Sequence, residues 1–260
     1  MAIELGCDLP FRSAVYPSRD AMLRVRVRCT DEASADDLRR IQAHGVIFFE
    51  AALLGMGAGP RVAPALSSES IDDALHVAIQ GPGAHAGVLM EAKVVVDPSY
   101  VTVLFHKLWA LHDIVPITEV VVELPESTES ALVVTRTELS GLPSLHPSLP
   151  FAFEDDMGGS RSDRSVLIGF MQPPNEDTLE VLRHGMRVWI SQALQGGYLF
   201  AHVSADDYFV SADDQFALVG DEVEWILEKC RVDLRGLNGM VHFLAGVHAS
   251  VAAVKFVVLE

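Results

Sequence analysis

The two halves of the sequence repeat one pattern of elements roughly 140 positions apart. In the first half, residues 23–29 alternate apolar side chains with arginines, which is the period-two pattern of a half-buried strand. Residues 165–170 form a more apolar counterpart in the second half, typical of a central strand. Self-similarity at a fixed spacing indicates a duplicated structural unit.

Each of these strands leads through a polar turn into a predicted helix. Ser34 in the first half, and residues 173–177 in the second, supply the polar groups that cap a helix N-terminus. Both helices contain a histidine followed by glycine, at His44 and at His184, and both end on glycines. We interpret the two histidines as equivalent positions of the repeat.

After each helix the sequence predicts two strands, a second helix and a closing pair of strands. In the first half these elements cover residues 75–79, 87–96, 98–112, 118–124 and 131–137. In the second half they cover residues 198–203, 216–219, 221–232, 240–244 and 251–259. The order predicts an α+β fold built as a tandem duplication of a ferredoxin-like plait (βαββαβ plus an extra strand), with antiparallel sheets and helices on one face.

A segment rich in Pro, Ser, Gly and acidic residues separates the two halves and is typical of a linker. The predicted organisation is a first α+β repeat over residues 1–139, a linker over 140–163 and a second repeat over 164–260. By analogy with other duplicated plaits, we expect the two sheets to pair with each other.

The charge balance limits the partners of the protein. The 260 residues include 19 Lys and Arg against 36 Asp and Glu, for a net charge of −17. Phosphate binding needs clustered basic residues, so we expect no nucleic acid partner, and an anionic membrane surface is disfavoured by the same sign. An unknown protein, a small molecule or a second copy in a homo-oligomer remain as partners.

Cysteine usage and the N-terminal sequence favour a cytoplasmic protein. Cys7, Cys29 and Cys230 are few and far apart, which argues against a disulfide framework. The first twenty residues are interrupted by charges and prolines, so they do not form a signal-peptide core. The longest apolar-rich stretch, residues 46–59, is shorter than a membrane span.

Histidines are the weak catalytic candidates of the chain. His44 and His184 could act as acid and base from related helices, with His202 as a third imidazole near the acidic stretch that follows it. The alternative, which the helical pattern favours for His184, is that these side chains are exposed and without a function.

A repeated Ser-Ala-Asp-Asp sequence brings Asp206, Asp207, Asp213 and Asp214 into one short stretch. Several carboxylates together are what Ca²⁺ and Mg²⁺ require, so these residues are the candidate metal ligands. The stretch lacks the alternating acidic order of a Ca²⁺ loop, and Ser and Asp are equally what turns require. We therefore expect no metal and no other cofactor.

The arginines Arg24, Arg26 and Arg28 share one face of the first predicted strand. Such a row could hold a carboxylate or phosphate on the open side of a sheet. The alternative is a solvated face on which the arginines pair with acidic residues of neighbouring strands.

The sequence contains no nucleophile elbow, phosphate loop or Cys-x-x-Cys pair, and it leaves open whether the protein is an enzyme. The first hypothesis is a non-catalytic protein that binds a ligand or another protein, such as an acidic inhibitor or immunity-type protein that masks a basic partner. The second is an enzyme with its active site between the two repeats, using His and Asp side chains.

Overall fold

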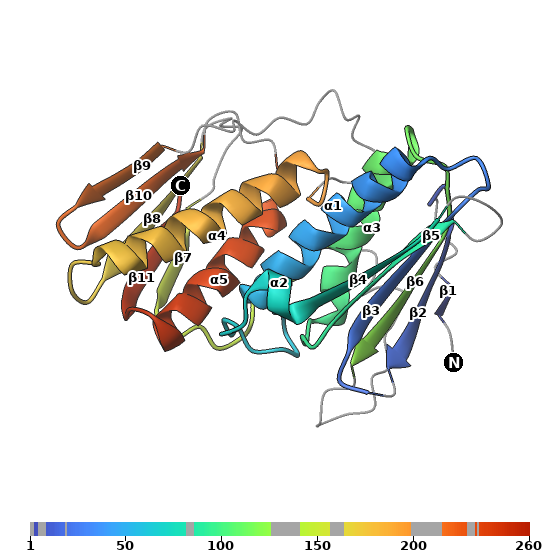
Figure 1. Cartoon of the computed structure of the whole chain (residues 1–260). Coiled ribbons are helices and arrows are strands. Elements are labelled where there is room, and N and C mark those ends of the chain that lie inside the picture. Colours follow the sequence, from blue (N-terminus) through green and yellow to red (C-terminus); the bar gives the residue numbers. More distant parts are fainter. Residues whose placement is uncertain are drawn as a thin grey trace.

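The chain folds into two α+β units whose helices pack against each other between two outer sheets (Figure 1). This computed structural model describes residues 3–4, 9–18, 20–81, 86–125, 141–156, 164–198, 215–227, 232 and 234–260.

The first unit places six strands in the order β1-β2-β6-β3-β5-β4. Its strands are β1 (Ile3–Glu4), β2 (Arg12–Ser18), β3 (Leu23–Cys29), β4 (Leu75–Gln80), β5 (Gly87–Ala92) and β6 (Ile117–Pro125). Its helices are α1 (Ala35–Leu53), α2 (Ile71–Ala74) and α3 (Val101–His112), the last preceded by a 3₁₀ turn at Pro98–Tyr100.

The second unit places five strands in the order β7-β11-β8-β10-β9. Its strands are β7 (Ala152–Asp155), β8 (Arg164–Phe170), β9 (Gln215–Val219), β10 (Glu222–Leu227) and β11 (Val254–Leu259). Its helices are α4 (Glu176–Leu194) and α5 (Leu237–Ser250), the last preceded by a 3₁₀ turn at Leu234–Gly236.

Apart from the two-residue strand β1, which has no counterpart among the described residues of the second unit, the two sheets share one topology, so the expected pair of similar α+β units is confirmed. In each unit the first long strand runs parallel to the last strand, β2 beside β6 and β7 beside β11. All other neighbours in both sheets are antiparallel. The extra strand therefore begins each unit, where we predicted it at the end, and the sheets are mixed where we predicted antiparallel ones.

The segment predicted as a linker contributes to the second unit. Residues 152–155 form β7, which pairs with β11 in the second sheet. Upstream of this strand, Leu142 is buried in the core. The backbone N–H of His146 donates to Nε2 of the buried His242 on α5, at 3.0 Å. Within 140–163, the described residues 141–156 are thus held against the second unit.

Two elements predicted for the second half are wrong. The predicted helix at 221–232 is the strand β10, because Val223, Trp225 and Leu227 are buried on one side of it at period two. The predicted strand at 240–244 lies within α5, a helix buried almost all round. The first half's predicted strand at 131–137 lies outside the described residues, as do residues 199–203 of another.

Helices α1 and α4 are equivalent, but the His-Gly pairs that suggested it are one residue out of register. The N-caps Ser34 and Asn175 are 141 positions apart, as are Gly55 and Gly196, which have φ angles of 80° and 82° at the two C-termini. His44 and His184 are 140 positions apart. The difference is visible in the packing: a Cβ on Gly45 would meet Met90 of the sheet, whereas one on Gly185 would meet Phe243 of α5. The two histidines therefore do not occupy equivalent positions.

The two units meet through their helices, and the predicted pairing of sheets is wrong (Figure 1). Helices α3 and α5 are buried on nearly their whole circumference, which a helix covered by a sheet on one side alone would not be. Trp225 of β10 packs edge-on against Trp189 of α4 on the helix-covered side of the second sheet, with ring centroids 5.5 Å apart. The other face of each sheet carries no helix among the residues that the structure describes. None of the described helices combines the length and apolar character needed to cross a bilayer.

Candidate binding site on the outer face of the first sheet

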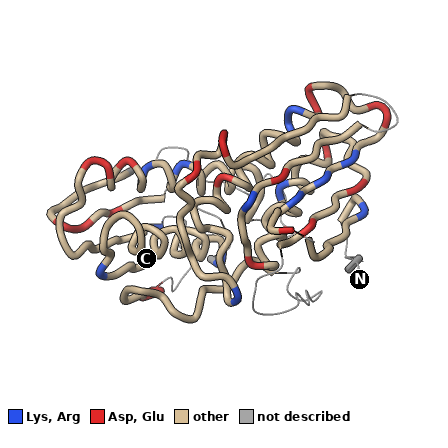
Figure 2. Tube along the Cα trace, turned by 60° about the horizontal axis from the view of Figure 1, so that its bottom comes forward, with Lys and Arg blue, Asp and Glu red and all other residues tan. Residues whose placement is uncertain are grey.

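The outer face of the first sheet carries the row of arginines predicted from the sequence. Strand alternation buries Leu23, Val25 and Val27 completely against the helices. Arg24, Arg26 and Arg28 consequently point away from the core, over the strands β6 and β5 that flank β3. Figure 2 shows basic and acidic positions interleaved across this sheet.

Arg24 is neutralised by three carboxylates. Its guanidinium lies 2.7 Å from Asp20, 2.9 Å from Glu91 on β5 and 3.4 Å from Glu123 on β6. Glu91 and Glu123 are its direct cross-strand neighbours, so the sheet register itself brings the charges together. The hydrogen bonds to Asp20 and then Glu91 raise the pKa of Arg24, and the same bond to Arg24 lowers the pKa of Asp20.

Arg28 is paired as well. Its guanidinium lies 2.7 Å from Glu119, the residue directly opposite on β6, and Arg12 of β2 approaches the same carboxylate at 4.0 Å. For Arg24 and Arg28, the prediction that the arginines pair with acidic residues of neighbouring strands is confirmed.

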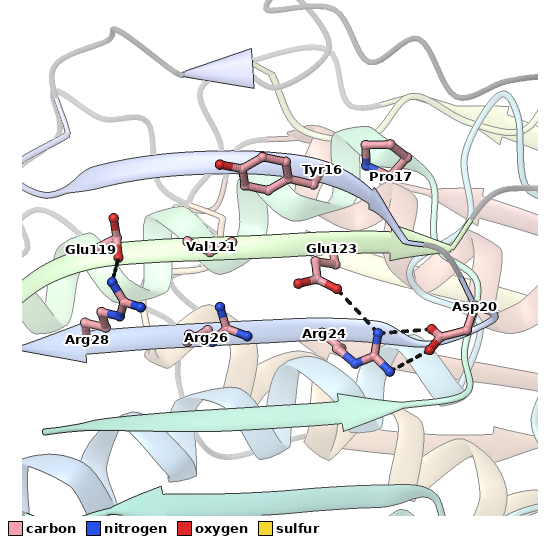
Figure 3. A pocket seen from close by; sticks show the side chains of 9 residues that line it. All are labelled: Tyr16, Pro17, Asp20, Arg24, Arg26, Arg28, Glu119, Val121 and Glu123. Carbon is pink, nitrogen blue, oxygen red and sulfur yellow. Dashed lines mark hydrogen bonds and ion pairs between the residues drawn. The ribbon is translucent and has the colours of Figure 1, made fainter. Parts of the chain in front are cut away.

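The side chain of Arg26, between these two, forms no ion pair or hydrogen bond with any other residue that the structure describes. Its cross-strand neighbours are Val121 on β6 and Leu89 on β5, so the register offers it no carboxylate. Figure 3 shows Glu119 bonded to Arg28 and Glu123 bonded to Arg24, with Arg26 unbonded in the middle of the row. The guanidinium of Arg26 is therefore free to form hydrogen bonds with a ligand, whereas those of Arg24 and Arg28 are already paired with carboxylates.

This guanidinium stands in an open hollow of about 700 Å³. Val121 lies in the hollow beside Arg26, and Tyr16 and Pro17 of β2 form its far side. Tyr16 is 39% exposed, so part of its ring is free to contact a ligand. A planar guanidinium offers two parallel N–H donors to a carboxylate, and the apolar surface next to it accommodates the carbon skeleton of such a ligand.

Two of the three histidines predicted as catalytic candidates, His44 on α1 and His184 on α4, lie on helices, on the side of the sheets away from this face. His184 Nε2 is 3.3 Å from Glu50 Oε1 of α1, so this pair bridges the two units. His44 is largely buried, and this burial is the main cause that lowers its pKa to about 4. His202, Asp206, Asp207, Asp213 and Asp214 lie outside the described residues. Within the described part, no three His, Cys, Asp or Glu side chains form a cluster suited to a metal ion.

A buried lysine at the centre of the helical layer was not singled out in the sequence. Lys107 of α3 is 0% exposed, and its Nζ has no hydrogen-bond partner among the described residues. Burial lowers the pKa of Lys107 well below its ordinary value. Burial also lowers the pKa of its neighbour His106 to about 4. The sequence signal was a lysine within an otherwise apolar helix, which could also have been an exposed position.

Comparisons with known proteins give no family for this chain. No family model and no curated protein sequence matches it. Among solved structures, the first half of the periplasmic protease PqqL from Escherichia coli is 8% identical with a TM-score of 0.26, and the match covers 87% of this chain and 67% of that one. A mutant of the ferredoxin protease FusC, in complex with Arabidopsis ferredoxin, is 9% identical with a TM-score of 0.22, over 93% of this chain and 35% of that one.

Complete PqqL is 12% identical with a TM-score of 0.21, and the match covers 92% of this chain and 36% of that one. This chain thus spans about a third of the length of FusC and of complete PqqL. Likenesses of this size carry no argument about activity, and the function has to be argued from the surface of the protein itself.

Proposed function

We propose that the protein is a non-catalytic binding protein whose first unit recognises a carboxylate-bearing ligand at Arg26. The observation that carries this proposal is the unpaired guanidinium in the 700 Å³ hollow, between two arginines that already have partners among the described residues. A carboxylate of the ligand would supply the partner that the sheet register withholds. An acidic inhibitor or immunity-type protein that masks a basic partner is another form of the non-catalytic role, in which acidic residues and not Arg26 would make the contact.

The geometry favours a monocarboxylate with a short apolar body over a polyanion. Glu119 and Glu123 lie on the strand next to Arg26, and both would repel a second negative group of the ligand. The partly exposed ring of Tyr16 and the side chain of Val121 offer apolar surface to the rest of the ligand. Because the hollow is open to solvent, we expect simple carboxylates to bind with dissociation constants on the order of millimolar.

Titration of ¹⁵N-labelled protein with isobutyrate, followed by NMR, tests this proposal. We expect shifts concentrated on β3 and β6 around Arg26. Arg26→Gln should abolish them, and Arg26→Lys should weaken them because an ammonium cannot form the two parallel hydrogen bonds. Arg187→Gln removes an exposed arginine from α4 and is the matched control. Equal binding by Arg26→Gln and Arg187→Gln would exclude Arg26 as the recognition group.

An enzyme with its active site between the two repeats is the second candidate. The contact between His184 and Glu50 supports it, because a histidine next to a carboxylate of the other unit is suited to acid–base chemistry. A catalytic activity of the purified protein that is retained by both His184→Gln and Glu50→Gln would exclude this pair.

Three finer properties are also proposed. The order β6-β3-β5-β4 with antiparallel neighbours supports a ferredoxin-like plait with an added strand in each unit. The buried, unpaired Cys29 supports a reducing, cytoplasmic environment. The proposed ligand is a small molecule or a protein segment. We also propose that the protein can form homo-oligomers, which sedimentation velocity would detect.

A further inference from the structure

The outer face of the second sheet corresponds in position to the arginine-bearing face, but its chemistry is different. On β10, Val223 and Trp225 are 0% exposed and face the helices, so Glu222, Glu224 and Ile226 point outward. On β11, Val257 is 0% exposed, which places Phe256 and Val258 on the outer face beside them.

The register shows which side chains replace the arginines. Leu167 of β8 lies between Val258 of β11 and Glu224 of β10, just as Arg26 lies between Val121 and Leu89 in the first sheet. At the position that Arg26 occupies in the first sheet, the second sheet therefore has Leu167, with the carboxylate of Glu224 on the neighbouring strand.

A glycine widens this apolar surface. Gly169 stands opposite Phe256, and a Cβ on this glycine would clash with the ring. The absence of a side chain at Gly169 lets the Phe256 ring approach β8 closely at this position. Val219 on the neighbouring edge strand β9 extends the same face and is 75% exposed.

We call this surface the second outer face. Its apolar residues are Leu167, Val219, Ile226, Phe256 and Val258. Its acidic residues are Glu154, Glu222 and Glu224, with Glu154 opposite Val258 on the parallel strand β7. One lysine, Lys255, lies 6.0 Å from the centroid of the Phe256 ring.

We propose that the second outer face docks a basic protein segment, whose apolar side chains cover Phe256 and Val258 and whose Lys or Arg side chains pair with Glu222 and Glu224. The inference rests on the non-catalytic binding role proposed above, but it uses the opposite end of the molecule. Charge complementarity selects the occupant: three carboxylates flank the apolar residues, and the net charge of −17 accelerates the approach of a cationic partner.

The same charges argue against a second copy as the occupant. In a two-fold symmetric contact through this face, the acidic residues of one copy would meet those of the other, and like charges facing each other cost stability. An anionic membrane would be repelled for the same reason.

The probe for this proposal is a short, fluorescently labelled peptide of alternating Lys and Leu, compared with one of alternating Glu and Leu. We expect the basic peptide to bind with a dissociation constant on the order of micromolar and the acidic peptide not to bind. Hydrogen exchange should slow in β10 and β11 on binding and stay unchanged in β3.

Charge reversal separates this face from the overall charge of the chain. The double variant Glu222→Lys/Glu224→Lys should bind the basic peptide at least about tenfold more weakly. Asp31→Lys/Glu32→Lys makes the same change in net charge at an exposed turn of the first unit and should bind as the wild type does. Equal loss in both double variants, or protection of β3 instead of β10, would overturn the proposal. So would a concentration-dependent dimer that the first double variant abolishes.

The test is independent of the Arg26 site. Arg26→Gln should bind the basic peptide normally, and Glu222→Lys/Glu224→Lys should bind isobutyrate normally. If the wild type binds only one of the two probes, the proposal for the other site has failed and the remaining proposal stands.

Discussion

Replacing the buried lysine should stabilise the protein and remove a dependence of its stability on pH. Lys107 is 0% exposed and its Nζ has no partner among the described residues, and this burial lowers the pKa of the amine well below its ordinary value. The unfolded chain binds a proton at this amine up to pH about 10.5. Between the lowered pKa and this value the unfolded state carries one more proton, so the free energy of unfolding rises with pH.

The magnitude follows from the proton count. A difference of one bound proton changes the free energy of unfolding by about 1.4 kcal/mol for each pH unit. Between about pH 7 and pH 8.5 the wild type should therefore gain up to about 2 kcal/mol from this group. This pH window lies above the range in which histidine side chains ordinarily titrate. It also lies below the range in which Cys29 acts, whose pKa is raised by burial from 9.0 to about 11 and whose effect on stability has the opposite sign.

Urea unfolding at several pH values, at constant ionic strength, measures this slope. Lys107→Met keeps the length of the side chain without the amine, and we expect it to be more stable than the wild type by at least about 2 kcal/mol near pH 7 and flat over the window. Lys93→Met, at an exposed position, should keep the wild-type slope. A flat wild-type profile, or a Lys107→Met variant that is less stable with the slope retained, would refute the reasoning.

Two further predictions concern buried positions of the second unit. Burial, and then the proximity of His146, lower the pKa of His242 from 6.5 to about 4, so the unfolded state binds the extra proton as the pH falls through this range. The wild type should lose about 3 kcal/mol from this group between pH 6.5 and pH 4, and His242→Gln should lose correspondingly less in the same urea titrations. Gly185→Ala should destabilise by about 1–3 kcal/mol, because its Cβ would clash with the ring of Phe243. Gly81→Ala, with no described atom within 4 Å of the new Cβ, is the control, and equal melting temperatures of the two variants would contradict the packing argument.

The parts of the fold with strong local signals could be predicted from the sequence. The alternation over Leu23–Cys29 and the cap at Ser34 place β3 and the start of α1 correctly, because both depend on neighbouring residues alone. The short apolar run at 240–244 has no clear period, and such runs are equally typical of a buried strand and a buried helix. Strand β2 contains Pro17 and owes its place to pairing with β6, about a hundred residues away, so no local signal marks it.

The candidate site was half predictable. The row of arginines and their pairing with acids follow from strand alternation and composition. Which arginine stays unpaired among the described residues depends on the cross-strand register, which sets Val121 and Leu89 against Arg26 and carboxylates against Arg24. The burial of Lys107 was beyond prediction for a similar reason, since it requires that the helices of one unit cover those of the other.

The parallel strands that begin each unit have a consequence for how the chain folds as it leaves the ribosome. Strand β7 has β11 as its partner in the second sheet, and β11 follows it by about a hundred residues in the sequence. Strand β2 likewise pairs with β6, so it cannot form this pairing until more than half of the first unit has been synthesised. Neither sheet can be completed before its last strand has been synthesised, and pairings this distant in sequence form slowly. We therefore expect the earliest native structure to be the hairpins β4–β5 and β9–β10, with the opening strand of each unit joining last.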